Sequence, residues 1–408
     1  MYCLKYLVKT YQRGVDVFTP DEVSWAIDVL KDMIAIPTVN PPGINYEKFV
    51  NKVSGILKTL DMEIEVIEVP EDIVRTRCSE CHGYPRYILI ARCGSGKPII
   101  QFNGHYDVVP PGEGWSSPPF TPRLENGKIF GRGAADMKGG IASVFLALRK
   151  FMHKHKDFKG TIEVALVPDE EIGGESGTGY LVKTLKEYPH HVIIAEPSGP
   201  SNIWIGHKGA LWGYVEVFGV QSHGSTPWRG INAFEYMAKI ALEFLDMHNR
   251  IAQKRESRYD YGDPNGTRPT INIGGEVRGS TKINVVPGYY AFSFDRRIIP
   301  EESLELVEKE IRDIVNRMAP AITSENSLTV SMLEKSVEKV LGVKPRKIVC
   351  MGGLDMHYYT ERGIEAIAYG PGPEENAHRV DEFVFIDEIV AVAAVYVSFL
   401  EELLEVVR

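Results

Sequence analysis

In Pro98-Ile-Ile-Gln-Phe-Asn-Gly-His-Tyr-Asp107, a short apolar run stops abruptly in polar residues. Three further runs have the same form: residues 161–167 before Glu170 and Glu171, residues 191–195 before Glu196, and residues 365–369 before Gly370, with His378 further along. Such runs, alternating with helical patterns, predict the buried strands of a layered α/β domain. Ligands of open α/β sheets bind at the carboxyl ends of the strands, so we expect these polar residues to converge on one crevice.

A fifth polar cluster, Gly131-Arg-Gly-Ala-Ala-Asp-Met-Lys-Gly-Gly140, precedes a helical apolar pattern and places Asp136 near a helix start. Earlier in the chain, Thr19-Pro-Asp-Glu22 has the form of a capping box, which predicts a helix from Pro20. A second helix is expected at about residues 46–60, and the alternating run at residues 63–69 predicts a strand.

The pattern of predicted strands and helices changes between about residues 206 and 322. Long alternating strands are expected at residues 211–220, 270–277 and 289–298, separated by helices near residues 233–248 and 302–318. Two helices and an antiparallel sheet make a separate α+β unit, inserted before the last strand-end cluster. The expected domains are residues 1–205 with 323–408, and the inserted residues 206–322.

The charge and hydropathy of the chain exclude some classes of function. Its 408 residues carry 46 Lys and Arg against 55 Asp and Glu, a formal charge of −9, which argues against nucleic acid as a partner. The most apolar stretch, residues 389–400, is shorter than the roughly 20 residues that span a bilayer, so it predicts a buried helix and no membrane partner. Charges near the N-terminus interrupt any signal-peptide core, and we expect a cytoplasmic protein.

The polar clusters supply two imidazoles and several carboxylates: His105, Asp107, Asp136, Glu170, Glu171, Glu196 and His378. This set suits zinc, cobalt or manganese and lacks the thiolates of a closed structural zinc site. It holds more carboxylates than one ion needs, which predicts two metal ions, and Asp136 could bridge them. Of the adjacent Glu170 and Glu171, one can bind metal while the other moves a proton. Asp107 can receive the ring N–H of His105 and so fix its orientation.

These motifs, in this order, resemble the M20 metallopeptidase and amidohydrolase family, which includes acetylornithine deacetylase, succinyl-diaminopimelate desuccinylase, aminoacylase-1 and glutamate carboxypeptidase. The resemblance covers about residues 27–400 and includes the final motif Ala-His378-Arg-Val-Asp-Glu. It implies an α/β fold: a three-layer catalytic domain with a mixed, mostly parallel sheet, plus an inserted α+β lid and dimerisation domain. It also implies a metal-dependent hydrolase of linear amides that forms a homodimer through the inserted domain.

The resemblance also assigns a role to each donor. The family's metal ligands fall on His105 and Glu196 for one ion, on Glu171 and His378 for the other, and on Asp136 as the bridge. The cofactor would be two zinc ions, with cobalt or manganese as alternatives. Glu170 would be the general base, and Asp107 would support His105.

Four further residues match the family's substrate-binding and catalytic positions. His223, in Ser-His-Gly-Ser-Thr-Pro, matches the histidine that reaches a neighbouring active site and polarises the scissile carbonyl. Asn284 and Arg297 match the pair that holds the carboxylate end of the substrate, a task that suits the guanidinium fork of arginine. Gly353 lies in a loop that borders the substrate pocket in the family.

The sequence departs from the family pattern around this pocket. Leu354 stands where many relatives have Thr or Ser, and His357 stands where they have Arg. Thr226 replaces the Tyr of the desuccinylase type, which disfavours a diaminopimelate substrate. The identity of the substrate therefore stays open.

The leading hypothesis is a deacylase of N-acyl amino acids, and the alternative within the family is a dipeptidase or carboxypeptidase. A two-metal phosphoesterase is a mechanistic rival, and a non-catalytic binding protein is a rival of another class. Single residues also have simpler explanations, since Arg297 could pair with an acidic neighbour. Cys78-x-x-Cys81 fits free thiols or a local disulfide better than a zinc knuckle, because no second half of the motif follows.

Overall fold

The computed structural model describes residues 17–75, 78–252, 254–280, 282–310, 315–318, 321–372 and 379–404. His378, a predicted metal ligand, lies outside these residues. The chain divides into two compact units. The first comprises Met1–Ile205, Thr323–Lys347 and Leu354–Arg408, and the second comprises Gly206–Ile322 and Ile348–Gly353.

The first unit is built on a mixed sheet. Its strand order is β1 (Glu63–Val69), β2 (Arg86–Ser95), β6 (Gly160–Val167), β3 (Ile99–His105), β7 (His191–Ile194), β17 (Ala366–Ala368) and β8 (Asn202–His207), with β16 (Arg346–Cys350) also paired to β8. The central strands β6, β3, β7 and β17 run parallel, while β2 and β8 run antiparallel to their neighbours. The predicted mixed, mostly parallel sheet is confirmed.

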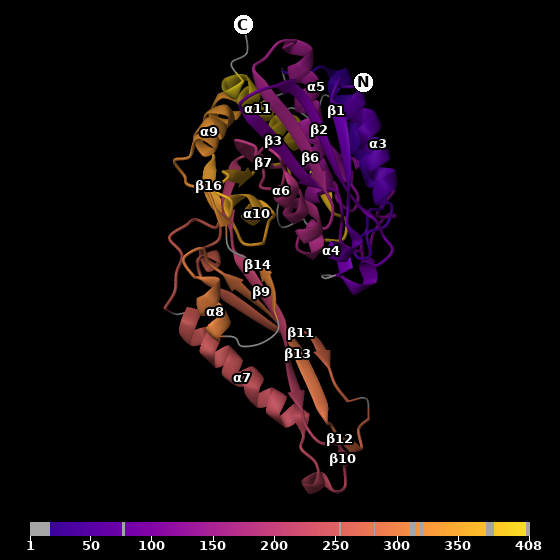
Figure 1. Cartoon of the computed structure of the whole chain (residues 1–408), viewed down its shortest axis with the longest axis vertical. Coiled ribbons are helices and arrows are strands. Elements are labelled where there is room, and N and C mark those ends of the chain that lie inside the picture. The colour runs from indigo at the N-terminus through magenta and orange to yellow at the C-terminus, as the bar shows by residue number, and fades with distance from the viewer. Residues whose placement is uncertain are drawn as a thin grey trace. The chain divides into compact units, whose positions relative to one another are not determined.

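Helices cover both faces of this sheet (Figure 1). Successive residues of β3 point in opposite directions: the Phe102 ring lies 5.0 Å from that of Tyr396, whereas Asn103 Nδ2 donates to Tyr359 Oη at 2.9 Å. Tyr396 belongs to α11 (Ile386–Leu403) and Tyr359 to α10 (Met356–Thr360), so helices pack against both faces of β3. This is the three-layer arrangement expected of the catalytic domain.

The remaining elements of the first unit follow the predicted pattern. Thr19 caps the first helix: its hydroxyl accepts from Glu22 N at 3.3 Å, and the Glu22 carboxylate accepts from Thr19 N at 2.7 Å. The helices are α2 (Pro20–Ile34), α3 (Tyr46–Lys58), α4 (Glu71–Arg75), α5 (Gly139–Lys154), α6 (Tyr180–Thr184) and α9 (Leu328–Leu341), and a small sheet contains β4 (Arg123–Glu125), β5 (Lys128–Phe130) and β18 (Phe383–Phe385).

The C-terminal helix α11 is the buried apolar helix that the sequence predicts, since its residues from Ile389 to Leu400 are all buried. Among the helices of the described ranges, none combines the length and the apolar character needed to cross a membrane. The cytoplasmic location stays a prediction.

The second unit is an α+β structure around an antiparallel sheet. Its strand order is β11 (Thr270–Arg278), β13 (Tyr289–Ile298), β9 (Gly209–Phe218) and β14 (Val315–Met318). The long helix α7 (Ala233–Ala252) packs on this sheet, where Phe244 contacts the rings of Phe292 and Phe294. The shorter elements are α8 (Leu304–Glu310), the paired strands β10 (Ser222–His223) and β12 (Val285–Val286), and β15 (Ala321–Ile322), which pairs with the end of β8.

The predicted helix at residues 302–318 is wrong at residues 315–318. Helix α8 ends at Glu310, and residues 315–318 form β14, which pairs antiparallel with β9. The free edge of β9 offers unpaired backbone groups that a neighbouring segment can satisfy. Pairing with β9 therefore determines the conformation of residues 315–318, because local helix propensity is only a weak determinant of structure.

The start of α5 approaches the end of β7 so closely that only glycine fits between them. A Cβ atom added to Gly140 would lie 1.9 Å from the backbone oxygen of Ala195. Asp136 precedes this helix start and Glu196 follows Ala195 directly. The close approach therefore sets the spacing between two of the predicted metal ligands.

We expect Gly140→Ala to destabilise the protein and to weaken its binding of divalent metal, because helix and strand end must separate to admit the methyl group. The matched control is Gly55→Ala in helix α3, where an added Cβ meets nothing within 4 Å. That change should stabilise the protein by about 0.5 to 1 kcal/mol, since alanine favours helices over glycine. Thermal unfolding and metal titration measure both effects. Equal behaviour of the two variants would contradict the packing argument.

Candidate metal centre

Three predicted ligands converge at one end of the first unit's sheet. His105 Nε2 lies 2.9 Å from Asp136 Oδ1 and 3.7 Å from Glu196 Oε1. One donor atom from each of the three residues lies within 4.8 Å of the other two. One imidazole and two carboxylates form a mixed nitrogen and oxygen set that suits zinc, cobalt or manganese.

The sheet explains why these residues meet. His105 is the last residue of β3, and Glu196 follows the end of β7, the parallel neighbour of β3. Asn103 of β3 pairs with Ile194 of β7, so His105 and Glu196, each two residues further along the chain, lie at the same level. Asp136 joins them from the turn Ala134–Lys138 that precedes α5.

Burial disfavours the ionised form of Glu196 in this cluster. Burial, assisted by Asp136 and opposed by His105, raises the pKa of Glu196 well above its ordinary value. Burial alone would lower the pKa of His105, but its hydrogen bonds to Asp107 and Asp136 outweigh this and raise it well above the ordinary value. Several buried acids around one imidazole are an arrangement that a divalent cation would stabilise.

Asp107 connects His105 to the loop that follows β6. His105 Nδ1 lies 3.1 Å from the backbone oxygen of Asp107 and 3.4 Å from its Oδ1. The two carboxylate oxygens of Asp107 accept from the backbone N–H groups of Glu170, at 3.3 Å, and Glu171, at 3.2 Å. One buried side chain thus sets both the orientation of the imidazole and the position of the two glutamates.

Asn40, which the sequence analysis did not single out, completes the surroundings of Asp107. Its Nδ2 donates to Asp107 Oδ2 at 2.9 Å and to Asp169 Oδ1 at 3.0 Å. Asp169 in turn accepts from Arg86 Nε at 2.8 Å and from the Tyr46 hydroxyl at 3.1 Å. The Arg86 and Asp169 side chains are fully buried. The only sequence signal for Asp169 is its position directly before Glu170, and Asn40 has none beyond preceding two prolines.

Glu170 and Glu171 lie in a short turn, Glu170–Ile172, immediately after β6. Burial raises the pKa of Glu170 well above its ordinary value, and the charges of Glu196, Asp355 and Glu171 add to this while His105 opposes it. A carboxyl group with a raised pKa holds a proton more firmly than an ordinary carboxyl group, which suits it to relay one. The carboxylate of Glu171 also contributes to the raised pKa of Glu196, so it belongs to the same electrostatic cluster.

Glu382 holds the turn that carries Asp136. Its Oε1 accepts from the backbone N–H groups of Ala135 and Asp136, each at 3.0 Å, and its Oε2 accepts from Arg132 at 2.5 Å. Burial, together with the charge of Asp136, raises its pKa to about 7. Glu382 is the last residue of the motif that contains His378, and its role is not predicted from the sequence.

Asp355 is a second buried acid with no predicted role. Its Oδ1 would lie 2.1 Å from a Cβ atom on Gly174, in the loop after Glu171. Burial raises its pKa to about 6, against the effect of a hydrogen bond from Thr178. Gly353, the predicted substrate-binding residue nearby in the sequence, belongs to the second unit.

The second unit brings His223 and Asn284 together. His223 pairs with Val285 across β10 and β12, and the backbone oxygen of Asn284 accepts from Gly224 N at 2.8 Å. The His223 side chain is exposed, and its Nδ1 lies 2.7 Å from the Ser225 hydroxyl. His223 and Asn284 therefore lie at one end of the unit, beside the β10 and β12 pair.

Arg297 lies apart from that pair within the same unit. It is near the far end of β13, about 25 Å along the strand from Tyr289 at the usual rise per residue. Its Nε lies 2.9 Å from Asp295 Oδ1, and its guanidinium lies 5.6 Å from the centre of the Trp212 ring. Arg297 therefore has the acidic neighbour that the simpler explanation requires.

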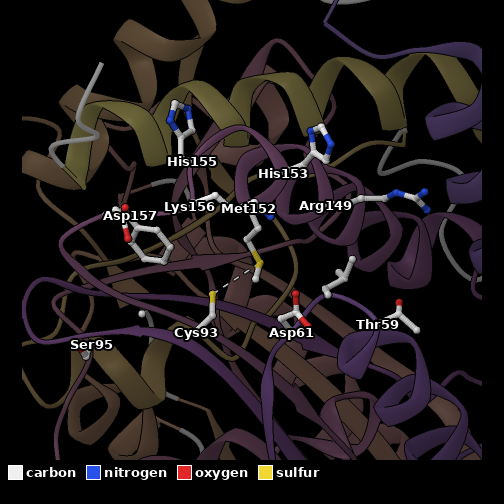
Figure 2. A pocket seen from close by; sticks show the side chains of 13 residues that line it. Thr59, Asp61, Cys93, Ser95, Arg149, Met152, His153, His155, Lys156 and Asp157 are labelled. Carbon is white, nitrogen blue, oxygen red and sulfur yellow. Dashed lines mark hydrogen bonds between the residues drawn. The ribbon is translucent and has the colours of Figure 1, made fainter.

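A separate cavity of about 830 Å³ opens elsewhere in the first unit (Figure 2). Cys93 and Ser95 of β2 line it, together with residues of α5 and the loop that follows. Ser95 pairs with Gly160, the first residue of β6, whereas His105 pairs with Val167, the last. The cavity thus lies at the opposite ends of the strands, and no predicted site residue of the described ranges lines it.

Comparisons with known proteins agree with this geometry. The family model of peptidase family M20/M25/M40 matches residues 101–402. Succinyl-diaminopimelate desuccinylase of Methylococcus capsulatus is 30% identical over 386 residues, covering 85% of this chain and 99% of that protein. The enzyme of the same name from Wolinella succinogenes is 29% identical and covers 92% of this chain and 98% of that protein.

Solved structures share the fold. An M20 family metallo-carboxypeptidase from Sulfolobus solfataricus superposes with a TM-score of 0.74 at 20% identity, covering 92% of this chain and 98% of that one. A dinuclear metal-binding peptidase of the M20 family from Bacillus subtilis has a TM-score of 0.63 at 15% identity, covering 95% and 100%. The resemblance read from the motifs is confirmed: the chain belongs to peptidase family M20/M25/M40 and is a metal-dependent hydrolase of amide bonds.

Proposed function

We propose that this protein is a two-metal deacylase that cleaves the amide bond of an N-acyl amino acid bearing a free carboxylate. The single observation that carries the proposal is the cluster of His105, Asp136 and Glu196 at the ends of parallel strands, with Glu170 beside it. The desuccinylase names of relatives at about 30% identity support an acylated amino acid as substrate, and they favour a succinyl group over other acyl groups.

The proposed metal ligands are those of the sequence analysis. His105 and Glu196 would hold one ion, Glu171 and His378 the other, and Asp136 both. Zinc fits this set first, with cobalt and manganese as alternatives. When bound, such ions polarise a carbonyl group and lower the pKa of a coordinated water.

The side chains of the protein have their own tasks in this reaction. Glu170 takes a proton from the attacking water on its carboxylate and delivers it to the nitrogen of the leaving amine. The raised pKa of Glu170 supports this assignment, because a strongly acidic carboxylate would hold the proton too weakly to relay it. Asp107 keeps the imidazole of His105 in one orientation and holds the backbone of Glu170 in place.

The two units would have different roles. In this proposal the first unit is the catalytic domain, and the second is a lid through which two copies form a homodimer. His223 would reach the active site of the neighbouring copy, Asn284 and Arg297 would hold the substrate's carboxylate end, and Gly353 would border the substrate pocket. Large apolar side chains exposed on α7, such as Leu242 and Phe234, support a contact surface on this unit.

A dipeptidase or carboxypeptidase activity is the second candidate. The loop around Gly353, where Leu354 and His357 depart from the pattern of many relatives, leaves the substrate open, and the carboxypeptidase and peptidase names of two structures with this fold support this candidate. His357 is buried and its ring lies 3.9 Å from that of Tyr358, so it cannot replace an arginine as a free cation. Burial also lowers its pKa.

A substrate panel separates these candidates. The protein, supplied in turn with zinc, cobalt and manganese, is assayed on N-succinyl and N-acetyl amino acids, on dipeptides and on a chromogenic phosphate ester. The proposal predicts that kcat/KM is highest for an N-acyl amino acid. Preference for dipeptides would support the second candidate, and hydrolysis of the phosphate ester alone would contradict both.

Glu170→Gln should lower turnover by a factor of about 10² or more while the metal content stays at the wild-type level, because the amide cannot accept the proton. Glu175→Gln is the matched control, since Glu175 lies in the same loop and pairs with Lys183 at 3.5 Å. It should leave turnover unchanged. Metal analysis by mass spectrometry beside steady-state kinetics measures both quantities. Loss of metal in Glu170→Gln would make Glu170 a ligand and overturn its assignment as the base.

A further inference from the structure

Cys78 and Cys81 form a disulfide in the first unit. The two sulfurs differ in their surroundings, because Cys81 is buried, with 1% of its surface exposed, whereas Cys78 is partly exposed. The pair lies between α4 and β2, and its function is not explained by the metal cluster itself.

The disulfide packs beneath the loop that carries Glu170. Cys81 belongs to a buried apolar cluster with Val167, the last residue of β6, and Leu181 of α6. Cys78 and Ile172 pack against the same cluster. Ile172 is in the turn with Glu170, so the disulfide and the proposed base share one packing unit.

Asn40 connects the disulfide more directly to Asp107. The Nδ2 group of Asn40 donates to both Asp107 and Asp169, while its Oδ1 lies 4.0 Å from the Cys81 sulfur. A disulfide sulfur has no hydrogen to donate, whereas a thiol at the same place can donate to an amide oxygen. Within the described ranges of the chain, Asn40 Oδ1 has no other donor, and an unpaired buried carbonyl oxygen costs free energy. The reduced form would therefore hold the amide in its present orientation more firmly.

We propose that Cys78 and Cys81 are a thiol–disulfide exchange site whose reduction strengthens the hold of Asn40 on Asp107. The reduced protein then binds divalent metal more tightly and turns over faster than the oxidised protein. The effect on metal binding follows from the orientation of His105, which Asp107 fixes. The effect on turnover rests on the proposed function.

A dithiol supplies the two electrons that reduce the Cys78–Cys81 disulfide. A thiolate of the dithiol attacks Cys78 Sγ, which is the more exposed sulfur, and the Cys78–Cys81 bond breaks. Cys81 leaves as a thiolate and takes a proton from solvent to become the thiol that faces Asn40. The second thiol of the reductant, as its thiolate, attacks the mixed disulfide and releases Cys78, which is protonated in turn. The protein gains two electrons and two protons, and the dithiol becomes a cyclic disulfide.

A disulfide with a purely structural role predicts a different outcome. It would change the free energy of unfolding, chiefly through the unfolded chain, and the short loop that it closes would make this effect small. It would leave the metal affinity of the folded protein unchanged. Metal affinity therefore separates the two roles.

The test compares cobalt binding by metal-free protein in its oxidised and reduced forms. Alkylation and mass spectrometry count the free thiols of each form, and the reductant is removed before titration because thiols bind metal. We expect the reduced form to bind cobalt about two- to tenfold more tightly, the effect of one added hydrogen bond. Turnover of the best panel substrate should rise by a similar factor.

Three variants make the test specific. Cys78→Ser leaves the Cys81 thiol in place and should match the reduced protein with or without reductant. Cys81→Ala removes the donor and should match the oxidised protein under both conditions. Cys93→Ser, at a cysteine in the separate cavity, should respond to reductant as the wild type does.

Equal cobalt affinity of the oxidised and reduced wild type would overturn the proposal, and so would Cys81→Ala binding cobalt as tightly as Cys78→Ser. The failure of the proposed function has another signature. If no panel substrate is hydrolysed but cobalt affinity still depends on the redox state, the exchange site stands and the proposed substrate class falls.

Discussion

The carboxylate of Asp107 is the contact on which the arrangement of the candidate centre depends. It lies at the end of β3, faces His105 with one oxygen, and accepts backbone N–H groups of Glu170 and Glu171 from the loop after β6. It thus fastens two segments that are more than 60 residues apart in sequence. Asn40 closes the network from the N-terminal side of the chain. The position of the proposed base relative to the imidazole follows from this one buried group.

The free-energy cost of burying carboxylates explains why the network around Asp107 contains so many hydrogen-bonding and charged partners. Buried carboxylates are expensive unless they are paired or hydrogen-bonded, and the pKa values of Glu170 and Glu196 are raised accordingly. Asp169 is accommodated by the buried guanidinium of Arg86. A divalent cation would relieve the remaining repulsion among Asp136, Glu196 and their neighbours. Relief of this repulsion would therefore contribute to the affinity of the site for metal.

Local sequence patterns were sufficient for the strands β3, β6 and β7, for their polar ends and for the helix capped by Thr19, but not for β2 or β14. The convergence of His105, Asp136 and Glu196 was predictable because parallel strands expose their carboxyl ends at one edge. The supporting residues Asn40 and Arg86 were not, since their partners are chosen by tertiary packing and leave no periodic signal.

The same reason explains the error at residues 315–318. Pairing with the edge of β9 decides their conformation, and that edge is about 100 residues away in sequence. The roles of His223, Asn284 and Arg297 came from family resemblance alone, and they stay predictions. His378 stays a prediction as well, because it lies outside the described residues.

Anomalous diffraction from crystals grown with zinc would locate the metal ions of the candidate centre. The account predicts two zinc ions, both bound to Asp136 and one of them about 2.0 to 2.2 Å from His105 Nε2 and a Glu196 carboxylate oxygen. Zinc bound only elsewhere, with His105, Asp136 and Glu196 in contact with solvent or with one another, would contradict it.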